Sequence, residues 1–287
     1  MEKAKKKRFG LIAAIVLALL IVLGVWGGLA KGASEAKHVD TFDRIKEQHR
    51  IVWGVKADTR LFGLMNTKTG EYEGFDVDIA RAVTKQIAKD QNIKLKAELV
   101  QVSSSSKIQL LKNANIDATA SVMTITKERE NQVDFTQPYF PAGQSLLVKE
   151  NSDIRSVKDL NQPGRTVIGA VGTTAIPTMK EFAPKVRVLS LADYAQSMTA
   201  LKAGQGDALT TDNAILYGLA QQNPGYKIVG GNFTNQPYGL ATDNDQPRMI
   251  AAMNKALDEL EKNGTYNRLI KKWFSNVPGL DWRTLQK

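Results

Sequence analysis

Residues 121–129, Ser-Val-Met-Thr-Ile-Thr-Lys-Glu-Arg, combine residue types that can bind an anion. A predicted strand ends in hydroxyl residues, a helix begins, and an arginine lies in the first helical turn. Free N–H groups at a helix N-terminus attract anions, and a guanidinium can hold a carboxylate through two hydrogen bonds. The segment therefore predicts a carboxylate site at Arg129. The alternative for this arginine is a salt bridge on the helix surface.

Two further loops offer complementary groups. Residues 210–213, Thr-Thr-Asp-Asn, follow a strand in the second half of the chain, and Asp212 can accept hydrogen bonds from an ammonium group. Its alternative role is the N-cap of a helix predicted at 214–221. The loop of Gly172, Thr173 and Thr174 offers N–H and hydroxyl donors. An anion site and an ammonium acceptor together predict a zwitterionic ligand.

Residue counts exclude several kinds of site. The chain has no cysteine, which excludes disulfides, thiol nucleophiles and cysteine-based zinc sites. The two histidines, His38 and His49, precede the first predicted strand at residue 51, so neither a Ser–His–Asp triad nor a histidine metal site is expected. We expect no metal and no cofactor. Catalysis would depend on Lys, Asp, Glu, Ser or Tyr.

The N-terminal segment accounts for much of the net charge of +10 and predicts export. Residues 1–33 hold six basic residues and one acidic residue, which leaves +5 on the rest of the chain, with scattered lysines that do not predict nucleic-acid binding. Residues 9–30 are 22 uncharged residues, long enough as a helix to cross a membrane. The basic flank places the N-terminus in the cytoplasm. Residues 1–33 are therefore predicted to be a retained anchor helix or a cleaved signal peptide, and both place the remainder outside the cytoplasm.

Alternating strand and helix patterns predict an α/β fold with two lobes. Strands are expected at 51–56, 95–102 and 117–123, and helices at 77–88 and 107–113. Residues 111–118 and 201–208 match at four of eight positions, which indicates two lobes of one plan.

Extended stretches near 141–148 and 236–242 are predicted to be hinge strands that cross between the lobes. Lobe 1 would then comprise 38–142 with 240–287, and lobe 2 would comprise 149–235. The alternative is that the two stretches are ordinary strands of one sheet.

The motifs, taken in order, identify a family resemblance over about residues 40–275. They are Gly-Phe-Asp-Val-Asp-Ile-Ala at 74–80, Met-Thr-Ile-Thr with Glu-Arg at 123–129, Val-Asp-Phe to Pro-Tyr-Phe at 133–140, Gly-Asp-Ala at 206–208, Thr-Asp-Asn at 211–213, Pro-Tyr-Gly at 237–239, and Gly-Thr-Tyr through Lys-Trp-Phe at 264–274. The chain resembles the polar-amino-acid family of ABC-transporter substrate-binding proteins (bacterial solute-binding protein family 3), in particular its glutamine/glutamate/aspartate branch.

The resemblance implies a type II periplasmic-binding-protein-like fold with the ligand enclosed between the lobes. It assigns the α-carboxylate of the ligand to Arg129, helped by Thr124, the main chain at Val122, and Thr173 or Thr174. It assigns the α-ammonium to Asp212, and side-chain selectivity to Lys56, Asp58, Arg60, Phe62 and Lys107.

Departures from the family pattern bear on specificity. Lys107 stands where arginine is usual in binders of acidic and amide ligands, Gln109 where proline is common, and Val122 where glycine or threonine is usual. A lysine keeps the positive charge but loses the bidentate fork. Lys56 and Lys107 together favour glutamate, glutamine or aspartate over a basic amino acid.

The predicted function is capture of a polar L-amino acid by hinge closure, followed by delivery to an ABC permease. We expect a monomer. An alternative is an enzyme on the same fold, because some relatives are dehydratases of cyclic acids and would need a general acid in the cleft. A surface-anchored sensor or adhesin is a third possibility.

Overall fold

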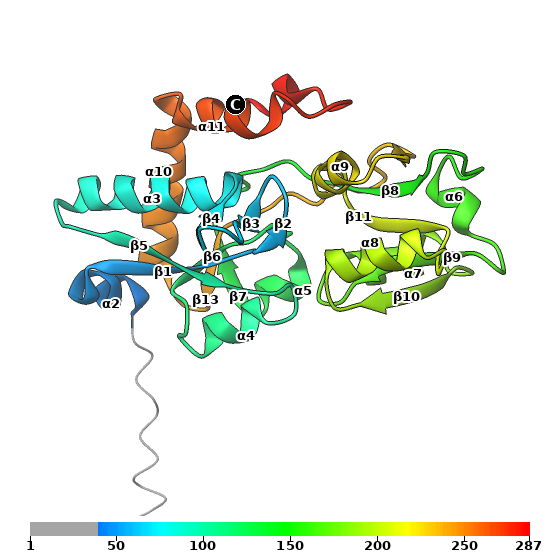
Figure 1. Ribbon diagram of the computed structural model, residues 1–287. Coiled ribbons are helices and arrows are strands. Elements are labelled where there is room, and N and C mark those ends of the chain that lie inside the picture. The colour runs from blue at the N-terminus through cyan, green and yellow to red at the C-terminus, as the bar shows by residue number, and fades with distance from the viewer. Residues whose placement is uncertain (1–39) are drawn as a thin grey trace, which may run out of the picture. The chain divides into compact units, whose positions relative to one another are not determined.

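Two five-stranded sheets, each covered by helices, form the centres of two lobes (Figure 1). This computed structural model describes residues 40–287. The predicted signal or anchor segment, residues 1–33, lies outside the described residues, as does His38. Within residues 40–287, no helix is both long enough and apolar enough to span a membrane.

Lobe 1 has the strand order β5-β1-β6-β13-β7. Its strands are β1 (Arg50–Val55), β5 (Lys96–Gln101), β6 (Ala118–Ala120), β7 (Val133–Phe135) and β13 (Ala241–Asp243). Strand β1 is parallel to β5 and β6, whereas β13 is antiparallel to β6 and β7. A small antiparallel sheet is formed by β2 (Asp58–Thr59), β3 (Gly63–Met65) and β4 (Tyr72–Glu73). The helices are α2 (Thr41–Gln48), α3 (Phe75–Gln91), α4 (Lys107–Lys112), α5 (Lys127–Glu130), α10 (Pro247–Lys262), α11 (Thr265–Phe274) and the 3₁₀ helix η1 (Trp282–Leu285).

Lobe 2 repeats the plan with the order β10-β9-β11-β8-β12. Its strands are β8 (Gln144–Lys149), β9 (Thr166–Ala170), β10 (Arg187–Leu191), β11 (Ala208–Asp212) and β12 (Tyr226–Val229), and its helices are α6 (Val157–Leu160), α7 (Ala175–Phe182), α8 (Tyr194–Lys202) and α9 (Asn213–Gln222). Strands β9, β10 and β11 are parallel, and β8 is antiparallel to both of its neighbours, β11 and β12, as β13 is to β6 and β7 in lobe 1. The predicted α/β fold with two lobes is confirmed.

The internal sequence repeat has a structural cause. Each copy of the repeat ends in Asp-Ala. The alanine is the first residue of β6 in lobe 1 and of β11 in lobe 2, and each of these strands is third in the spatial order of its sheet. Asp117 accepts a hydrogen bond from the main-chain N–H of Val52 on β1 at 2.7 Å, and Asp207 accepts one from Thr166 on β9, also at 2.7 Å. The two carboxylates thus hold the start of the equivalent neighbouring strand in each lobe.

The chain crosses between the lobes twice, after β7 and after β12. The two crossing segments lie side by side, because Tyr238 N donates to Phe140 O at 2.9 Å and Gln236 N donates to Ala142 O at 2.7 Å. Strand β8 begins at Gln144 within the sheet of lobe 2, so the first crossing ends before most of the predicted hinge stretch 141–148.

A buried aromatic cluster supports the crossing segments where they meet lobe 1. Its members are Phe62, Phe75, Tyr139, Phe140, Tyr238, Tyr266 and Phe274. Neighbouring rings such as Phe62 and Phe140, with centroids 5.0 Å apart, pack edge to face. Gly74, directly before Phe75 of this cluster, has φ 145°. A Cβ there would lie 2.0 Å from the Phe62 carbonyl oxygen. This contact explains the glycine in the motif at 74–80.

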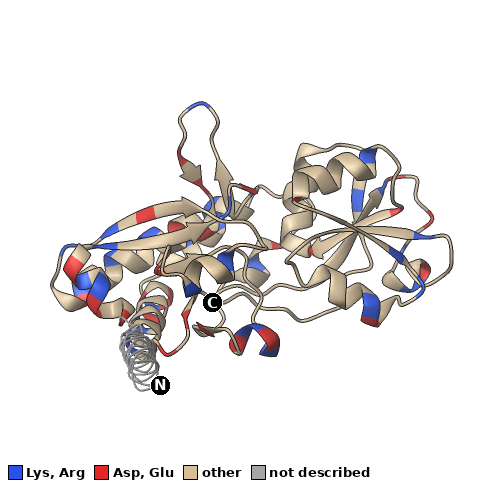
Figure 2. Ribbon diagram, turned by 90° about the horizontal axis from the view of Figure 1, so that it is seen from below, with Lys and Arg blue, Asp and Glu red and all other residues tan. Residues whose placement is uncertain are grey.

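Basic and acidic residues are interspersed over both lobes in Figure 2. The mixture agrees with a near-balanced charge for the part of the chain after residue 33.

Candidate functional site

Buried charged side chains gather where the carboxyl ends of strands from both lobes face each other. Lys56 follows β1, Lys107 begins α4 and Arg129 lies in α5, all in lobe 1. Asp212 ends β11 in lobe 2. None of the four is more than 9% exposed. Ligands of open α/β sheets bind outside the carboxyl ends of strands, and the site predicted from the sequence lies there.

Arg129 is held by its own helix end and by the other lobe. The Thr126 side chain caps α5 by accepting a hydrogen bond from Arg129 N at 3.2 Å. The guanidinium donates from Nη1 to Thr124 O at 2.9 Å and from Nη2 to Gly172 O at 3.0 Å. Burial lowers its pKa, and Asp212 opposes that effect. The alternative of a surface salt bridge is wrong, because this guanidinium is buried and bonded to carbonyl groups.

Asp212 presents a carboxylate oxygen to the same region. Its Oδ2 accepts a hydrogen bond from the Tyr238 hydroxyl at 2.7 Å, whereas its buried Oδ1 has no hydrogen-bond partner among residues 40–287. Asp212 is the N-cap residue of α9, but its side chain makes no capping hydrogen bond. Burial raises the pKa of Asp212 to about 6, and Tyr238 and Arg129 oppose the rise. A buried unpaired acceptor is costly, so a donor from a ligand would be stabilising here.

The two lysines lie in the same charged cluster. Lys56 Nζ is 3.0 Å from Asp58 Oδ1 and 5.7 Å from the centroid of the Tyr194 ring, which belongs to lobe 2. Lys107 Nζ donates to Ser121 O at 2.9 Å. Burial lowers the pKa of Lys107 well below its ordinary value, and the charges of Arg129 and Lys56 lower it further.

The main chain at Val122 differs from what the resemblance implies. Its N–H donates to Asp76 Oδ2 at 2.7 Å and is therefore not available to a ligand carboxylate. The group that Val122 can offer to a ligand is its carbonyl, which suits an ammonium. Thr124, whose carbonyl accepts from Arg129, is buried.

The loop at Thr173 and Thr174 begins α7 beside the cluster. Thr173 Oγ1 donates to Ala170 O at 2.6 Å, and Thr174 Oγ1 donates to Gln236 Oε1 at 2.6 Å. Both hydroxyl hydrogens are therefore bonded within the protein, so the donors that this loop can offer to a ligand are main-chain N–H groups.

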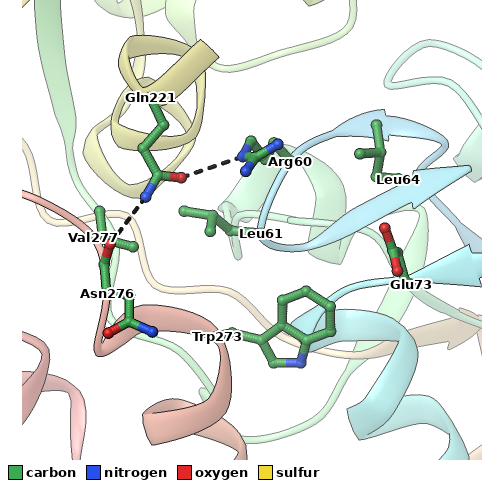
Figure 3. Close-up of a pocket in the computed structure, with 8 residues that line it drawn as sticks. All are labelled: Arg60, Leu61, Leu64, Glu73, Gln221, Trp273, Asn276 and Val277. Atoms are coloured by element: carbon green, nitrogen blue, oxygen red, sulfur yellow. Dashed lines mark hydrogen bonds between the residues drawn. The ribbon is translucent and has the colours of Figure 1, made fainter. Parts of the chain in front are cut away.

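The structure does not bring Arg60 or Phe62 into the charged cluster. Arg60 is exposed and donates from Nε to Gln221 Oε1 at 3.2 Å. It lines a separate pocket between the small β2–β4 sheet, the end of α11 and α9 (Figure 3). Phe62 is fully buried in the aromatic cluster. Leu61, which lies between them, has a left-handed backbone with φ 74°.

Three contributors have no predicted role from the sequence. Tyr194 lies beside Lys56, and its hydroxyl is 3.1 Å from Thr211 Oγ1. Tyr238 orients Asp212, and Asp76 holds Val122. Tyr238 and Asp76 belong to the sequence motifs Pro-Tyr-Gly and Gly-Phe-Asp, and these motifs could have identified the two residues as parts of the site. Tyr194 carries no comparable motif.

The lobes touch around the cluster. Gly172 has φ 74°, and a Cβ there would lie 2.6 Å from the main chain of Ser104 and Ser105 in lobe 1. The charged groups are therefore enclosed between the lobes. Among residues 40–287 no group of three or more His, Cys, Asp or Glu side chains is arranged to hold a metal ion.

Comparison with known proteins agrees with this architecture. The model of the family described as bacterial extracellular solute-binding proteins, family 3, matches residues 51–276. The "ABC transporter glutamine-binding protein GlnH" of Bacillus subtilis (strain 168) is 45% identical over 95% of this chain and 99% of that relative. The "Glutamine-binding protein" of Geobacillus stearothermophilus is 48% identical over 74% of this chain and 80% of that relative.

Solved structures show the same similarity. The P235GK mutant of ArgBP from T. maritima has a TM-score of 0.73 at 33% identity, covering 82% of this chain and 100% of that chain. The ancestral amino acid-binding protein AncCDT-1, a precursor of cyclohexadienyl dehydratase, has a TM-score of 0.74 at 34% identity, covering 82% of this chain and 99% of that chain.

Proposed function

Because the chain belongs to the bacterial extracellular solute-binding proteins of family 3, we propose that it captures a polar L-amino acid for an ABC importer. L-Glutamine is the first ligand to test, since two similar relatives are named for glutamine binding. The observation that carries the proposal is the buried pair of Arg129 and Asp212, one from each lobe, in which Asp212 Oδ1 has no hydrogen-bond partner within residues 40–287.

The α-amino and α-carboxylate groups of a ligand fit this pair. A guanidinium has five N–H donors, and the hydrogen bonds to Thr124 and Gly172 use two of them. The remaining donors can hold a carboxylate with bidentate geometry. Asp212 Oδ1 can then accept from the ammonium, with Tyr238 fixing the other oxygen of the same carboxylate. The Val122 carbonyl is a second ammonium acceptor.

The part of the cluster around Lys56, Lys107 and Asp58 suits a ligand whose side chain ends in an amide. Lys56 and Lys107 are donors for an amide or carboxylate oxygen, and Asp58, 3.0 Å from Lys56, is an acceptor for an amide N–H. A basic side chain would meet two lysines. A glutamate carboxylate would meet Asp58 as a like charge, which disfavours it relative to glutamine.

Delivery of the ligand follows its capture. The two crossing segments act as the hinge between lobe 1 (38–142 with 240–287) and lobe 2 (149–235), and the closed monomer docks on a membrane permease. Residues 1–33 direct export and either tether the protein to the membrane or are removed.

Thermal unfolding against the twenty amino acids tests the proposal. A ligand that binds only the folded state stabilises it by about 2.7 kcal/mol at a hundredfold excess over its Kd. We expect an increase in the unfolding midpoint with L-glutamine that exceeds those with glutamate and aspartate. An unchanged midpoint with all twenty contradicts the proposal. NMR of the incubated ligand separates a receptor, which returns glutamine unchanged, from an enzyme.

A further inference from the structure

Asp76 is a buried carboxylate that joins three segments around the site. It lies in the first turn of α3 and is 0% exposed. Its Oδ1 accepts from the Tyr139 hydroxyl on the first crossing segment at 2.7 Å, and its Oδ2 accepts from Val122 N at 2.7 Å. Both oxygens therefore face donors fixed by other elements.

The peptide unit between Ser121 and Val122 is held at both ends. Lys107 Nζ donates to its carbonyl oxygen at 2.9 Å, and Asp76 accepts from its N–H. A cation and a carboxylate thus fix the orientation of one peptide plane. Thr124 and Arg129 follow directly along the chain, so this plane sets the start of the loop that carries them.

Val122 also has an unfavourable backbone conformation. Its φ is 46°, in the left-handed region that β-branched residues rarely adopt. A residue in such a strained conformation persists only where its surroundings hold it. The hydrogen bond from its N–H to Asp76 Oδ2 is one contact that restrains it.

We propose that Asp76 is a positioning residue for ligand recognition, because its hydrogen bond to the Val122 N–H keeps Val122 left-handed and so sets the start of the loop that carries Thr124 and Arg129. This inference rests on the proposed function. The ionised carboxylate of Asp76 accepts hydrogen bonds from both donors, the Tyr139 hydroxyl and the Val122 N–H. The amide of an asparagine at this position could accept at only one of its two side-chain atoms. Burial raises the pKa of Asp76 to about 7, while Tyr139, Val122 and the charge of Lys107 oppose the rise.

A double-mutant cycle with Asp76→Asn and Val122→Gly tests the inference on the full chain. Glycine adopts positive φ freely, so it needs less restraint from Asp76. Isothermal titration with L-glutamine should show that Asp76→Asn weakens binding about tenfold when residue 122 is valine, and about threefold or less when it is glycine. Equal factors in the two backgrounds would overturn the inference, because a general role of Asp76 in folding would affect both equally.

Two controls separate this role from others. Tyr139→Phe removes the other hydrogen bond to Asp76, and Val122→Gly should not relieve its effect. Asp90→Asn changes an acid at the far end of α3, where it contacts Gln86 and Lys255, and should leave the Kd unchanged. If Asp76→Asn does not fold, Asp76→Glu, which misplaces the carboxylate by one methylene, enters the same cycle.

Failure of the proposed function can be distinguished from failure of this inference by a measurement that needs no ligand. If the unmodified protein does not bind L-glutamine, hydrogen exchange of the Val122 amide still tests the contact without any ligand. We expect slow exchange in the unmodified protein and faster exchange of this amide in Asp76→Asn. An unchanged rate would overturn the inference.

Discussion

Arg129 of lobe 1 donates a hydrogen bond from Nη2 to the carbonyl of Gly172 in lobe 2 at 3.0 Å. The group proposed to bind the ligand carboxylate therefore also joins the two lobes. We therefore expect ligand binding and closure of the lobes to depend on this one guanidinium.

Arg129→Lys should lower the affinity for L-glutamine by at least about a hundredfold. Lysine keeps the charge but cannot donate to Thr124, Gly172 and a carboxylate from one rigid plane. Isothermal titration measures the loss, with circular dichroism to verify the fold. The exposed neighbour Lys127→Ala is the matched control and should bind normally. Wild-type affinity in Arg129→Lys would contradict the assigned role.

Asp212 predicts opposite pH effects on stability and on binding. Burial raises its pKa to about 6 in the folded protein, from 3.8. Its contribution to the stability of the ligand-free protein is therefore fully present below pH 3.8 and is lost as the pH rises through about 6. A bound ammonium favours the ionised carboxylate, so affinity should fall as the pH drops below about 6.

The measurement compares the unfolding midpoint and the Kd of the unmodified protein and Asp212→Asn between about pH 4 and pH 8. The variant should lose this part of the pH dependence of stability and should bind L-glutamine poorly throughout. A variant with the same pH profile as the unmodified protein would show that Asp212 does not titrate as described.

Gly172→Ala should prevent full closure without unfolding either lobe. The added Cβ would lie 2.6 Å from the main chain of Ser104 and Ser105. We expect at least a tenfold loss of affinity and a larger radius of gyration with glutamine present, measured by small-angle X-ray scattering. Gly204→Ala is a matched control, because Gly204 has the same φ of 74° but open space around it. Equal effects of the two substitutions would assign the loss to backbone strain.

Contacts outside the charged cluster should set the lifetime of the closed form. Tyr217 on α9 donates from its hydroxyl to Gly279 O at 2.9 Å, and Gln221 donates to Asn276 O at 3.3 Å near the pocket in Figure 3. Both join lobe 2 to the C-terminal segment of lobe 1. Tyr217→Phe with Gln221→Ala should speed glutamine release several-fold in stopped-flow experiments, since most affinity changes appear in the dissociation rate. Gln222→Ala is the control. An unchanged rate of glutamine release in the double variant would show that these two contacts do not set the lifetime of the closed form.

The sequence allowed the strand-end positions of the site to be predicted, but not its supporting contacts. Arg129 lies in the helix after β6 and Asp212 ends β11, and the carboxyl ends of strands are where α/β sheets bind ligands. The bond between Asp76 and Val122 joins residues 46 positions apart and depends on how α3 packs, which no local pattern encodes. Arg60 could not be placed for a similar reason, because its hydrogen-bond partner, Gln221, is 161 positions away in the chain.

The insertion of one lobe within the other has a consequence for how the chain folds. All five strands of lobe 2 lie between β7 and β13, so that sheet can be completed from one continuous segment. In the sheet of lobe 1, β13 lies between β6 and β7 and is the last of its strands to emerge during synthesis or export. A chain interrupted before residue 241 would therefore expose two unpaired strand edges in lobe 1 while lobe 2 is already whole, and these edges are sites for aggregation or proteolysis.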